Sequence, residues 1–238
     1  MDDKIQKFKE MIDESDNIVF FGGAGVSTES GIPDFRSKDG LYNQKYKYPP
    51  EMILSHTFFM KNVDEFYKFY KDKLNSLKYE PNITHRKLAE LEKKGKLKAV
   101  VTQNIDGLHQ KAGSEKVYEI HGSVLRNYCM KCHKFYDANY VFESEGVPKC
   151  TCGGTIKPDV VLYEEGLPQN IWEKAIYSII NADVMIVAGT SLTVYPASSL
   201  INYYRGNKLI LINRDKTSFD SMANLVINDS LGNVFDKI

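Results

Sequence analysis

The segment GGAGVSTESGIPDFR, Gly22–Arg36, follows the apolar run Ile18–Phe21 and decides how the rest of the chain is interpreted. Glycines let the backbone approach a phosphate closely, and a helix opening just after them would direct free N–H groups and the positive end of its dipole toward that phosphate. A glycine cluster alone more often only reverses the chain. Because Ser27, Asp34 and Phe35–Arg36 follow it here, we favour a phosphate-binding loop.

Six apolar, strand-forming runs recur along the chain. They are almost continuously apolar rather than alternating, which predicts a parallel sheet covered on both faces. The six runs are Ile18–Phe21, Leu97–Val101, Val117–Ile120, Val184–Ala188, Lys208–Ile212 and Leu225–Ile227. Helical patterns such as Ile83–Lys94 and Gln169–Asn181 lie between them, and an amphipathic helix is expected at the N-terminus. This alternation predicts an α/β fold with a doubly wound, Rossmann-like parallel sheet.

Two segments interrupt the alternation of strands and helices. Lys38–Tyr79 is rich in tyrosine and helical toward its end, and Ser123–Lys157 holds all four cysteines. We expect these two insertions to pack together as a smaller second domain. The predicted division is therefore a Rossmann-like domain of residues 1–37, 80–122 and 158–238, and a small domain of residues 38–79 and 123–157.

The composition limits where the protein works and what it binds. The 238 residues include 31 Lys plus Arg and 31 Asp plus Glu, so no overall field attracts nucleic acid or a membrane surface. No apolar run reaches the roughly 18 to 20 residues of a membrane-spanning helix, and the charged N-terminus does not resemble a signal peptide. We expect a cytoplasmic protein that is a monomer and contacts neither membranes nor nucleic acid.

Polar residues follow the predicted strands at the points where they end. In open α/β sheets ligands bind beyond the carboxyl ends of the strands, so these residues are expected to meet in one crevice. Taken singly, Asn and Asp cap helices, Gly-Thr-Ser forms a turn, and a histidine is usually structural. Taken together, they favour a dinucleotide site, with Asn213 placed to bond a ribose. The segments are Thr102–Asp106, His121–Gly122, Gly189–Ser191 and Asn213–Asp215.

A hydride-transferring dehydrogenase is the obvious alternative. Its fingerprint needs a second strand ending in an acidic residue about 20 positions after the glycines. In this chain that stretch is Asp39–Pro50, which contains no apolar strand. The acidic clamp for the ribose hydroxyls is therefore missing.

The four cysteines form two pairs, Cys129-x-x-Cys132 and Cys150-x-Cys152. Paired cysteines of this kind are typical of a ribbon-type zinc site, whereas disulfides are disfavoured in a cytosolic chain. The second pair is one residue shorter than usual, so its turn must be tighter, and His133 remains a possible substitute ligand. Because four thiolates complete a tetrahedral zinc, the metal is expected to be structural.

Taken together, GAGVSTESGIPDFR, TQNID, HG, the paired cysteines, GTSLTVYPA and INRD occur in the order seen in sirtuins, the NAD-dependent protein deacylases. The chain resembles a short bacterial or archaeal member from Ile18 to about Val234. The resemblance implies that NAD is consumed: an acyl-lysine oxygen attacks the nicotinamide ribose as nicotinamide leaves, and the products are lysine and O-acetyl-ADP-ribose.

The resemblance also implies roles for individual residues. His121 is the general base that activates a ribose hydroxyl, and a neutral imidazole suits that work. Asn104 is catalytic and orients the ribose. Phe35 lies against the nicotinamide, with core packing as the alternative, and Arg36 lies near the phosphates. The implied NAD contacts are Gly23, Ala24, Gly25, Ser27, Phe35, Arg36, Gln103, Asn104, Ile105, Asp106, Gly189, Thr190, Ser191, Asn213, Arg214 and Leu231.

The segment Val160–Glu164 matches the one that receives the substrate backbone as an added strand, with Val160, Val161, Tyr163 and Glu164 as contacts. Sirtuins usually have Phe-Gly-Glu after the valines, whereas this chain has Tyr163-Glu164-Glu165 and its glycine at Gly166. Because glutamate restricts backbone angles and adds charge, we expect an altered peptide path.

The acyl preference has one clue in the sequence. Sirtuins that remove succinyl or malonyl groups carry a Tyr and an Arg three residues apart on a helix, and this chain has Tyr67 and Tyr70 at the matching places. Without a guanidinium to bind the extra carboxylate, acetyl or other neutral acyl groups are expected. Both tyrosines are expected to bind substrate, with packing of the helix as the alternative.

The sequence thus predicts a zinc-stabilised, NAD-consuming protein-lysine deacetylase. Mono-ADP-ribosyl transfer would use the same activated ribose and remains open as a side activity. A non-enzymatic nucleotide sensor with a protein-binding ribbon is a third interpretation. It predicts NAD binding without turnover, and the presence of Asn104, Asp106 and His121 argues against it.

Overall fold

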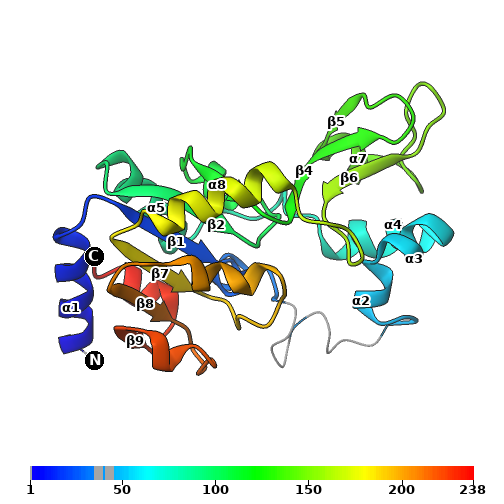
Figure 1. The fold of residues 1–238 in the computed structure, drawn as a ribbon. Coiled ribbons are helices and arrows are strands. Elements are labelled where there is room, and N and C mark those ends of the chain that lie inside the picture. The colour runs from blue at the N-terminus through cyan, green and yellow to red at the C-terminus, as the bar shows by residue number, and fades with distance from the viewer. Residues whose placement is uncertain (1, 35–39, 41–45) are drawn as a thin grey trace.

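The computed structural model describes residues 2–34, 40 and 46–238. Its largest element is a six-stranded sheet in the order β3-β2-β1-β7-β8-β9 (Figure 1), and every neighbouring pair is parallel. The strands are β1 (Ile18–Gly22), β2 (Leu97–Thr102), β3 (Val117–Glu119), β7 (Val184–Ala188), β8 (Lys208–Ile212) and β9 (Leu225–Ile227). All six predicted runs are confirmed as strands. In β1 and β7 every residue is buried, on both faces of the sheet, which explains why these two runs are apolar throughout.

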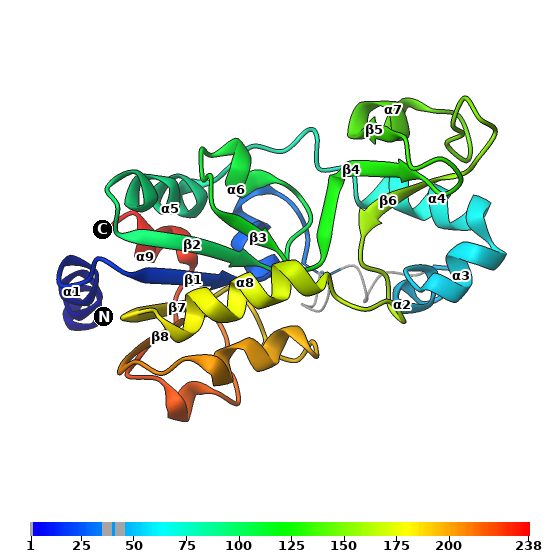
Figure 2. The same ribbon diagram turned by 45° about the horizontal axis from the view of Figure 1, so that its top comes forward.

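Helices cover both faces of this sheet, as predicted for a doubly wound fold. One face packs against α1 (Asp2–Asp13), α5 (Ile83–Lys93) and α9 (Leu231–Phe235) in a shared apolar core. The other packs against α8 (Gln169–Ile180) and the 3₁₀ segment Ala197–Tyr203. Figure 2 shows α8 lying across this second face. The strand order reverses between β1 and β7, which places a crevice at their carboxyl ends.

The two insertions form a separate module beside the sheet (Figures 1 and 2). Its helices are α2 (Pro50–Ile53), α3 (His56–Lys61), α4 (Val63–Lys73) and α7 (Ala138–Glu143). Its antiparallel sheet has the order β5-β4-β6, with β4 (Gly122–Cys129), β5 (Phe135–Asp137) and β6 (Ile156–Val160). Both insertions contribute side chains to one apolar cluster, which is distinct from the clusters on the large sheet.

Local sequence signals explain where several of these elements begin. Ser55 caps α3, since its Oγ accepts a 3.2 Å hydrogen bond from the Phe58 N–H. Asn82 opens α5 in a capping box with His85. A further helix of the large domain, α6 (Leu108–Lys111), follows Asp106, whose Oδ1 accepts from the Leu108 N–H at 2.9 Å. Within residues 2–34, 40 and 46–238, no helix has the length and apolar character needed to cross a membrane.

Candidate active site and metal centre

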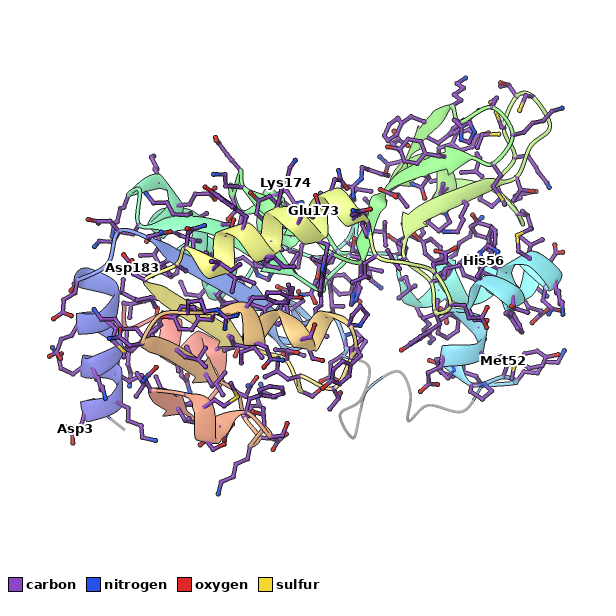
Figure 3. All side chains as sticks on the ribbon, viewed as in Figure 1. Asp3, Met52, His56, Glu173, Lys174 and Asp183 are labelled. Carbon is purple, nitrogen blue, oxygen red and sulfur yellow. The ribbon has the colours of Figure 1, made fainter. Side chains whose placement is uncertain are left out.

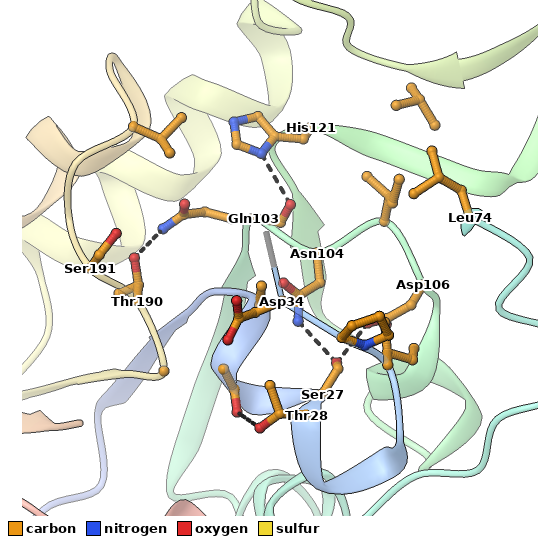
Figure 4. Close-up of a pocket in the computed structure, with 18 of the residues that line it drawn as sticks. Ser27, Thr28, Asp34, Leu74, Gln103, Asn104, Asp106, His121, Thr190 and Ser191 are labelled. Carbon is orange, nitrogen blue, oxygen red and sulfur yellow. Dashed lines mark hydrogen bonds between the residues drawn. The ribbon is translucent and has the colours of Figure 1, made fainter. Parts of the chain in front are cut away.

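A cleft of about 670 Å³ opens at the carboxyl ends of the parallel strands, between the large sheet and the small module. Its walls include residues that follow β1, β2, β3, β7 and β8, so the strand ends singled out in the sequence do converge. Figure 4 shows Ser27, Gln103, Asn104, His121 and Thr190 around this space. The arrangement matches the position expected for a ligand of an open α/β sheet.

The glycine-rich loop differs from the sequence expectation in one respect. No α-helix opens behind it among the described residues; two 3₁₀ turns, Ala24–Val26 and Thr28–Ser30, follow instead. Most amides of the loop are already used, because Gly25 N–H donates to Gly189 O at 2.8 Å and Ser27 N–H donates to Ala24 O at 3.0 Å. A helix dipole therefore does not act here.

Close contact between two loops explains the glycines better. A Cβ on Gly25 would lie 2.8 Å from the Cα of Gly189, and one on Gly189, where φ is +61°, would lie 2.5 Å from Val26 N. A Cβ on Gly23 would lie 2.8 Å from Thr190 Cβ. Glycine at these positions lets the loops after β1 and β7 meet and form the floor of the cleft.

A buried polar network links the loop after β1 to the loop after β2. Ser27 Oγ donates to Asp106 Oδ2 at 2.6 Å and accepts from Asn104 Nδ2 at 3.1 Å (Figure 4). Burial raises the pKa of Asp106, although the hydrogen bond from Ser27 opposes this shift. The network fixes Asn104 and Asp106 in the wall of the cleft, as a ligand-binding site requires.

His121 lies in the same wall, two residues after the end of β3. Its Nδ1 is 3.0 Å from the Gln103 carbonyl oxygen. Because a carbonyl only accepts, Nδ1 carries the proton, and Nε2 keeps a lone pair. Burial lowers the pKa of His121, and the hydrogen bond to Gln103 only partly offsets it. A neutral histidine with an available Nε2 can act as a general base.

Residues after β7 and β8 complete the opposite wall. Thr190 Oγ1 accepts from Gln103 Nε2 at 3.0 Å, and Thr190 N–H donates to Asn213 Oδ1 at 3.0 Å. The Nδ2 of Asn213 is buried and has no hydrogen-bond partner among the described residues. An unused donor in a cleft wall fits a ligand that brings hydroxyl or phosphate oxygens, and NAD is such a ligand.

The family model described as "Sir2 family" matches residues 23–196. The chain belongs to the Sir2 family. An NAD-dependent protein deacetylase of Clostridium perfringens is 62% identical and covers 100% of this chain and 99% of its own length. A protein of the same name from Cutibacterium acnes is 47% identical, over 98% of this chain and 96% of its own.

Solved Sir2 structures share the whole fold. One, described as Sir2 with p53 peptide and NAD+, is 41% identical, with a TM-score of 0.87 over 98% of this chain and 96% of that one. Another holds an inhibitor, 2′-O-acetyl-ADP-ribose and deacetylated p53 peptide; it is 39% identical, with a TM-score of 0.86 over the same shares.

Most site residues expected from the Sir2 motifs line the cleft. Phe35 and Arg36 lie outside the described residues, and Gly23 sits behind the wall, against Thr190. The expected residues that do line it are Ala24, Gly25, Ser27, Gln103, Asn104, Ile105, Asp106, His121, Val160, Val161, Tyr163, Glu164, Gly189, Thr190, Ser191, Asn213, Arg214 and Leu231.

The segment after β6 shows how this Sir2 protein accommodates glutamate where sirtuins usually have glycine. Glu164 has a left-handed backbone, with φ +76°, a conformation that non-glycine residues rarely adopt. Its Oε2 accepts from the Thr57 N–H at 2.9 Å at the start of α3, and this bond lowers the pKa of Glu164. Glu165 bonds His56 Nδ1 at 2.9 Å, so the loop is tied to the helices of the small module. Figure 3 labels His56 at this junction.

Tyr67 and Tyr70 do not reach the cleft. Their exposed fractions are 1% and 0%, and both belong to the apolar cluster of the small module. Tyr67 donates its hydroxyl to the Ile156 carbonyl, and Tyr70 stacks on Phe66 and Phe142. This burial supports the helical-packing alternative to substrate binding, because α4 turns this face inward to pack on β6.

The four cysteines form one cluster whose sulfurs all lie within 4.8 Å of one another. Cys129 Sγ is 3.5 Å from Cys152 Sγ, and Cys132 Sγ is 3.5 Å from Cys150 Sγ, so none is a disulfide, which needs about 2.0 Å. Tetrahedral zinc with bonds of about 2.3 Å fits this spacing.

The turns that present the cysteines also agree with the sequence. Gly153, with φ +80°, donates its N–H to Cys150 O at 2.8 Å and closes the tight turn of the shorter pair. His133 is not part of the cluster; its N–H donates to Cys129 O at 2.9 Å. The substitute-ligand alternative is therefore unnecessary.

The sequence analysis missed part of the cleft wall. Lys73, the last residue of α4, and Leu74 to Ser76 line it, and Ser76 Oγ donates to Asp106 O at 2.9 Å. Tyr195 also lines it. The segment after α4 carries no glycine, cysteine or repeated motif that would have distinguished it in the sequence.

Proposed function

We propose that the protein is an NAD-dependent protein-lysine deacetylase, which transfers the acetyl group to ADP-ribose and releases nicotinamide, O-acetyl-ADP-ribose and the free lysine. The single observation that carries this proposal is the cleft in which His121 and the Ser27–Asn104–Asp106 network face one space. The name shared by relatives with up to 62% identity supports it, as do Sir2 structures that hold p53 peptide with NAD+ or acetyl-ADP-ribose.

The residues have separate tasks. NAD, when bound, supplies an activated ribose carbon with nicotinamide as leaving group. His121 holds its proton on Nδ1 and takes a proton at Nε2 from a ribose hydroxyl, so it acts as the general base. Asn104 orients the ribose, since its side-chain amide is fixed by Ser27. Asp106 grips the nicotinamide carboxamide.

The remaining NAD contacts are assigned by place in the cleft. Following the Sir2 motifs, we assign Thr190, Ser191 and the Gly25–Gly189 contact, which line the cleft, to the phosphates and a ribose, and Asn213, Arg214 and Leu231, which also line it, to the adenosine end. Phe35 and Arg36 keep the roles that the motif implies, beside the nicotinamide and the phosphates. Val160, Val161, Tyr163 and Glu164 receive the substrate backbone.

The preferred acyl group is acetyl or another neutral one. No arginine lines the described part of the cleft near α4; the cation there is Lys73, which pairs with Asp72 at 2.9 Å. A fixed bidentate partner for a succinyl carboxylate is therefore missing in that part of the wall. Equal turnover of succinyl-lysine and acetyl-lysine peptides would refute this preference.

We further propose that the protein acts in the cytoplasm as a monomer and does not bind nucleic acid, which its balanced charge supports. The division into residues 1–37, 80–122 and 158–238 against 38–79 and 123–157 is also a proposal. The separate apolar cluster of the small module supports it, but β6 (Ile156–Val160) spans the boundary at 157/158 and pairs with β4 along its length.

The proposed function is tested by incubating the protein with NAD and an acetyl-lysine peptide and identifying the products by mass spectrometry. Nicotinamide and O-acetyl-ADP-ribose are expected in equal amounts, and His121→Ala should abolish both. ADP-ribosylated peptide as the main product would instead support the transferase alternative. NAD bound but unchanged would support a sensor.

A further inference from the structure

Arg126 lies where the small module joins the large sheet, and it binds a carboxylate on each side. Its Nη1 is 2.6 Å from Glu119 Oε2, and its Nε is 2.8 Å from Asp159 Oδ2. Glu119 ends β3, and its side chain is 6% exposed; Asp159 belongs to β6, and its side chain is 45% exposed. The two ion pairs therefore connect the large parallel sheet to the sheet of the small module.

The two carboxylates lie close in the chain to residues of the proposed active site. Glu119 precedes His121 by two residues, and Asp159 immediately precedes Val160 and Val161, the proposed receivers of the substrate backbone. The strands touch closely here: Gly122 has φ +76°, and a Cβ on it would lie 1.9 Å from Asp159 O. Val161 N–H donates to His121 O at 2.9 Å. Any shift of β6 would therefore move the peptide-receiving segment relative to His121.

The backbone of β4 shifts its register against β6 at this point. Gly122 and Ser123 pair with Val160 and Asp159, but the next paired residue is Asn127, opposite Pro158. Arg126 lies in the bulged stretch of β4, residues 124–126, which has no partner in β6 although every residue of β6 is paired; its own ladder partner is Asp137 of β5. From this bulge the side chain of Arg126 adds a link to Glu119 and to Asp159 beside the backbone ladder.

Charge and burial agree with a fixed bridge. Burial lowers the pKa of Arg126, but the hydrogen bonds that it donates to Glu119 and Asp159 outweigh this effect, so the net pKa is raised and the guanidinium stays charged. A lysine could not replace it, because a single ammonium lacks the planar fork that bonds two carboxylates in different directions. Arg126 is not among the residues lining the cleft, so it does not contact a ligand there.

We infer that Arg126 is a positioning residue that bridges Glu119 and Asp159 and thereby holds the peptide-receiving end of β6 in register with His121. This inference rests on the proposed function. It makes Arg126 responsible for productive binding of the acyl-lysine peptide and leaves the binding of NAD to other residues.

Asp159→Asn is the main test, because Asp159 is half exposed and its loss leaves the Arg126–Glu119 pair intact. We expect the KM for the acetyl-lysine peptide to rise about tenfold, equivalent to about 1.4 kcal/mol, while the dissociation constant of NAD stays within about twofold. Arg126→Lys should give the same pattern. Arg205→Met is the matched control, since Arg205 is exposed and bonds only Asn202 O in its own turn.

The double variant Arg126→Lys, Asp159→Asn separates positioning from general destabilisation. If both residues act through one bridge, its peptide KM should match that of the worse single variant rather than the product of the two effects. Peptide KM values equal to wild type in both single variants, or a rise in the dissociation constant of NAD as large as that in peptide KM, would overturn the inference. Wild-type protein that makes no O-acetyl-ADP-ribose would instead overturn the proposed function.

Discussion

The Nδ1 atom of His121 lies 3.0 Å from the carbonyl oxygen of Gln103. The two residues belong to loops that follow β3 and β2, which are neighbouring strands of the parallel sheet. The contact sets the tautomer of the imidazole and turns its second nitrogen into the acceptor. Because the acceptor is a backbone carbonyl, it does not titrate, and no substitution of the Gln103 side chain removes it. The orientation of His121 is therefore set by the fold.

This environment predicts the acid limb of the activity profile. Burial depresses the pKa of His121, so the neutral, basic form persists below pH 6.5, the ordinary midpoint of histidine. As the pH falls, the acid midpoint of kcat/KM for the acetyl-lysine peptide should therefore lie below pH 6.5. The pH dependence of kcat/KM measures this directly. An acid midpoint above pH 6.5 would contradict the role of burial.

Ser27→Ala should weaken NAD binding. The hydroxyl of Ser27 bonds both Asp106 and Asn104, and removing a hydrogen bond to a charged group costs about 1.5 to 3 kcal/mol, so the KM for NAD should rise at least about tenfold. Ser199→Ala is the matched control, because Ser199 Oγ bonds only the Pro196 carbonyl and lies outside the cleft. Steady-state kinetics at varied NAD concentrations measure this KM. An unchanged KM for NAD in Ser27→Ala would show that the network does not contribute to cofactor binding.

Loss of zinc should unfold the small module. Cys132→Ser removes one of four thiolates, and structural zinc sites contribute folding free energy outright, so bound zinc and thermal stability should both fall. Peptide deacetylation should be lost with them, because β6 pairs with β4 beside the cluster. The control is His133→Asn, which keeps all four thiolates and suits the left-handed backbone at φ +58°. Metal analysis that finds one zinc per chain in Cys132→Ser would contradict this account.

Tyr67 and Tyr70 should respond differently to the same substitution. Tyr67→Phe removes the donor to the Ile156 carbonyl, whereas the hydroxyl of Tyr70 is buried without a partner among the described residues. We expect Tyr67→Phe to lower the free energy of unfolding by about 1 to 3 kcal/mol and Tyr70→Phe to leave it unchanged or raise it. Urea denaturation compares them. If Tyr70→Phe instead raised peptide KM without changing stability, the tyrosine would act on substrate after all.

The sequence predicted the large sheet well because its signal is local. A strand buried on both faces must be apolar at every position, and Phe20 and Val187 are both fully buried. The convergence of His121, Asn104 and Asn213 followed from one rule, that parallel strands end at one edge. The zinc cluster followed from cysteine spacing.

The errors concern contacts between distant segments. The expected helix after Gly25 is replaced by 3₁₀ turns in a loop that packs on Gly189, a contact made by residues far away in the sequence. Tyr67 and Tyr70 were assigned to the substrate site from their positions on a predicted helix. Which side of α4 faces the cleft depends on how the helix packs against β6. The bridge from Arg126 to Glu119 and Asp159 depends on the bend of β4, which no local sequence pattern predicts.

The central claim is that the oxygen of the acyl-lysine amide captures the ribose carbon as nicotinamide departs. A peptide that carries the heavy oxygen isotope in its acetyl carbonyl, incubated with NAD and this protein, tests it most directly. Mass spectrometry should find the label on the ribose portion of the O-acetyl-ADP-ribose. Label that remains only in the acetyl group, or in free acetate beside intact or reduced NAD, would contradict the account.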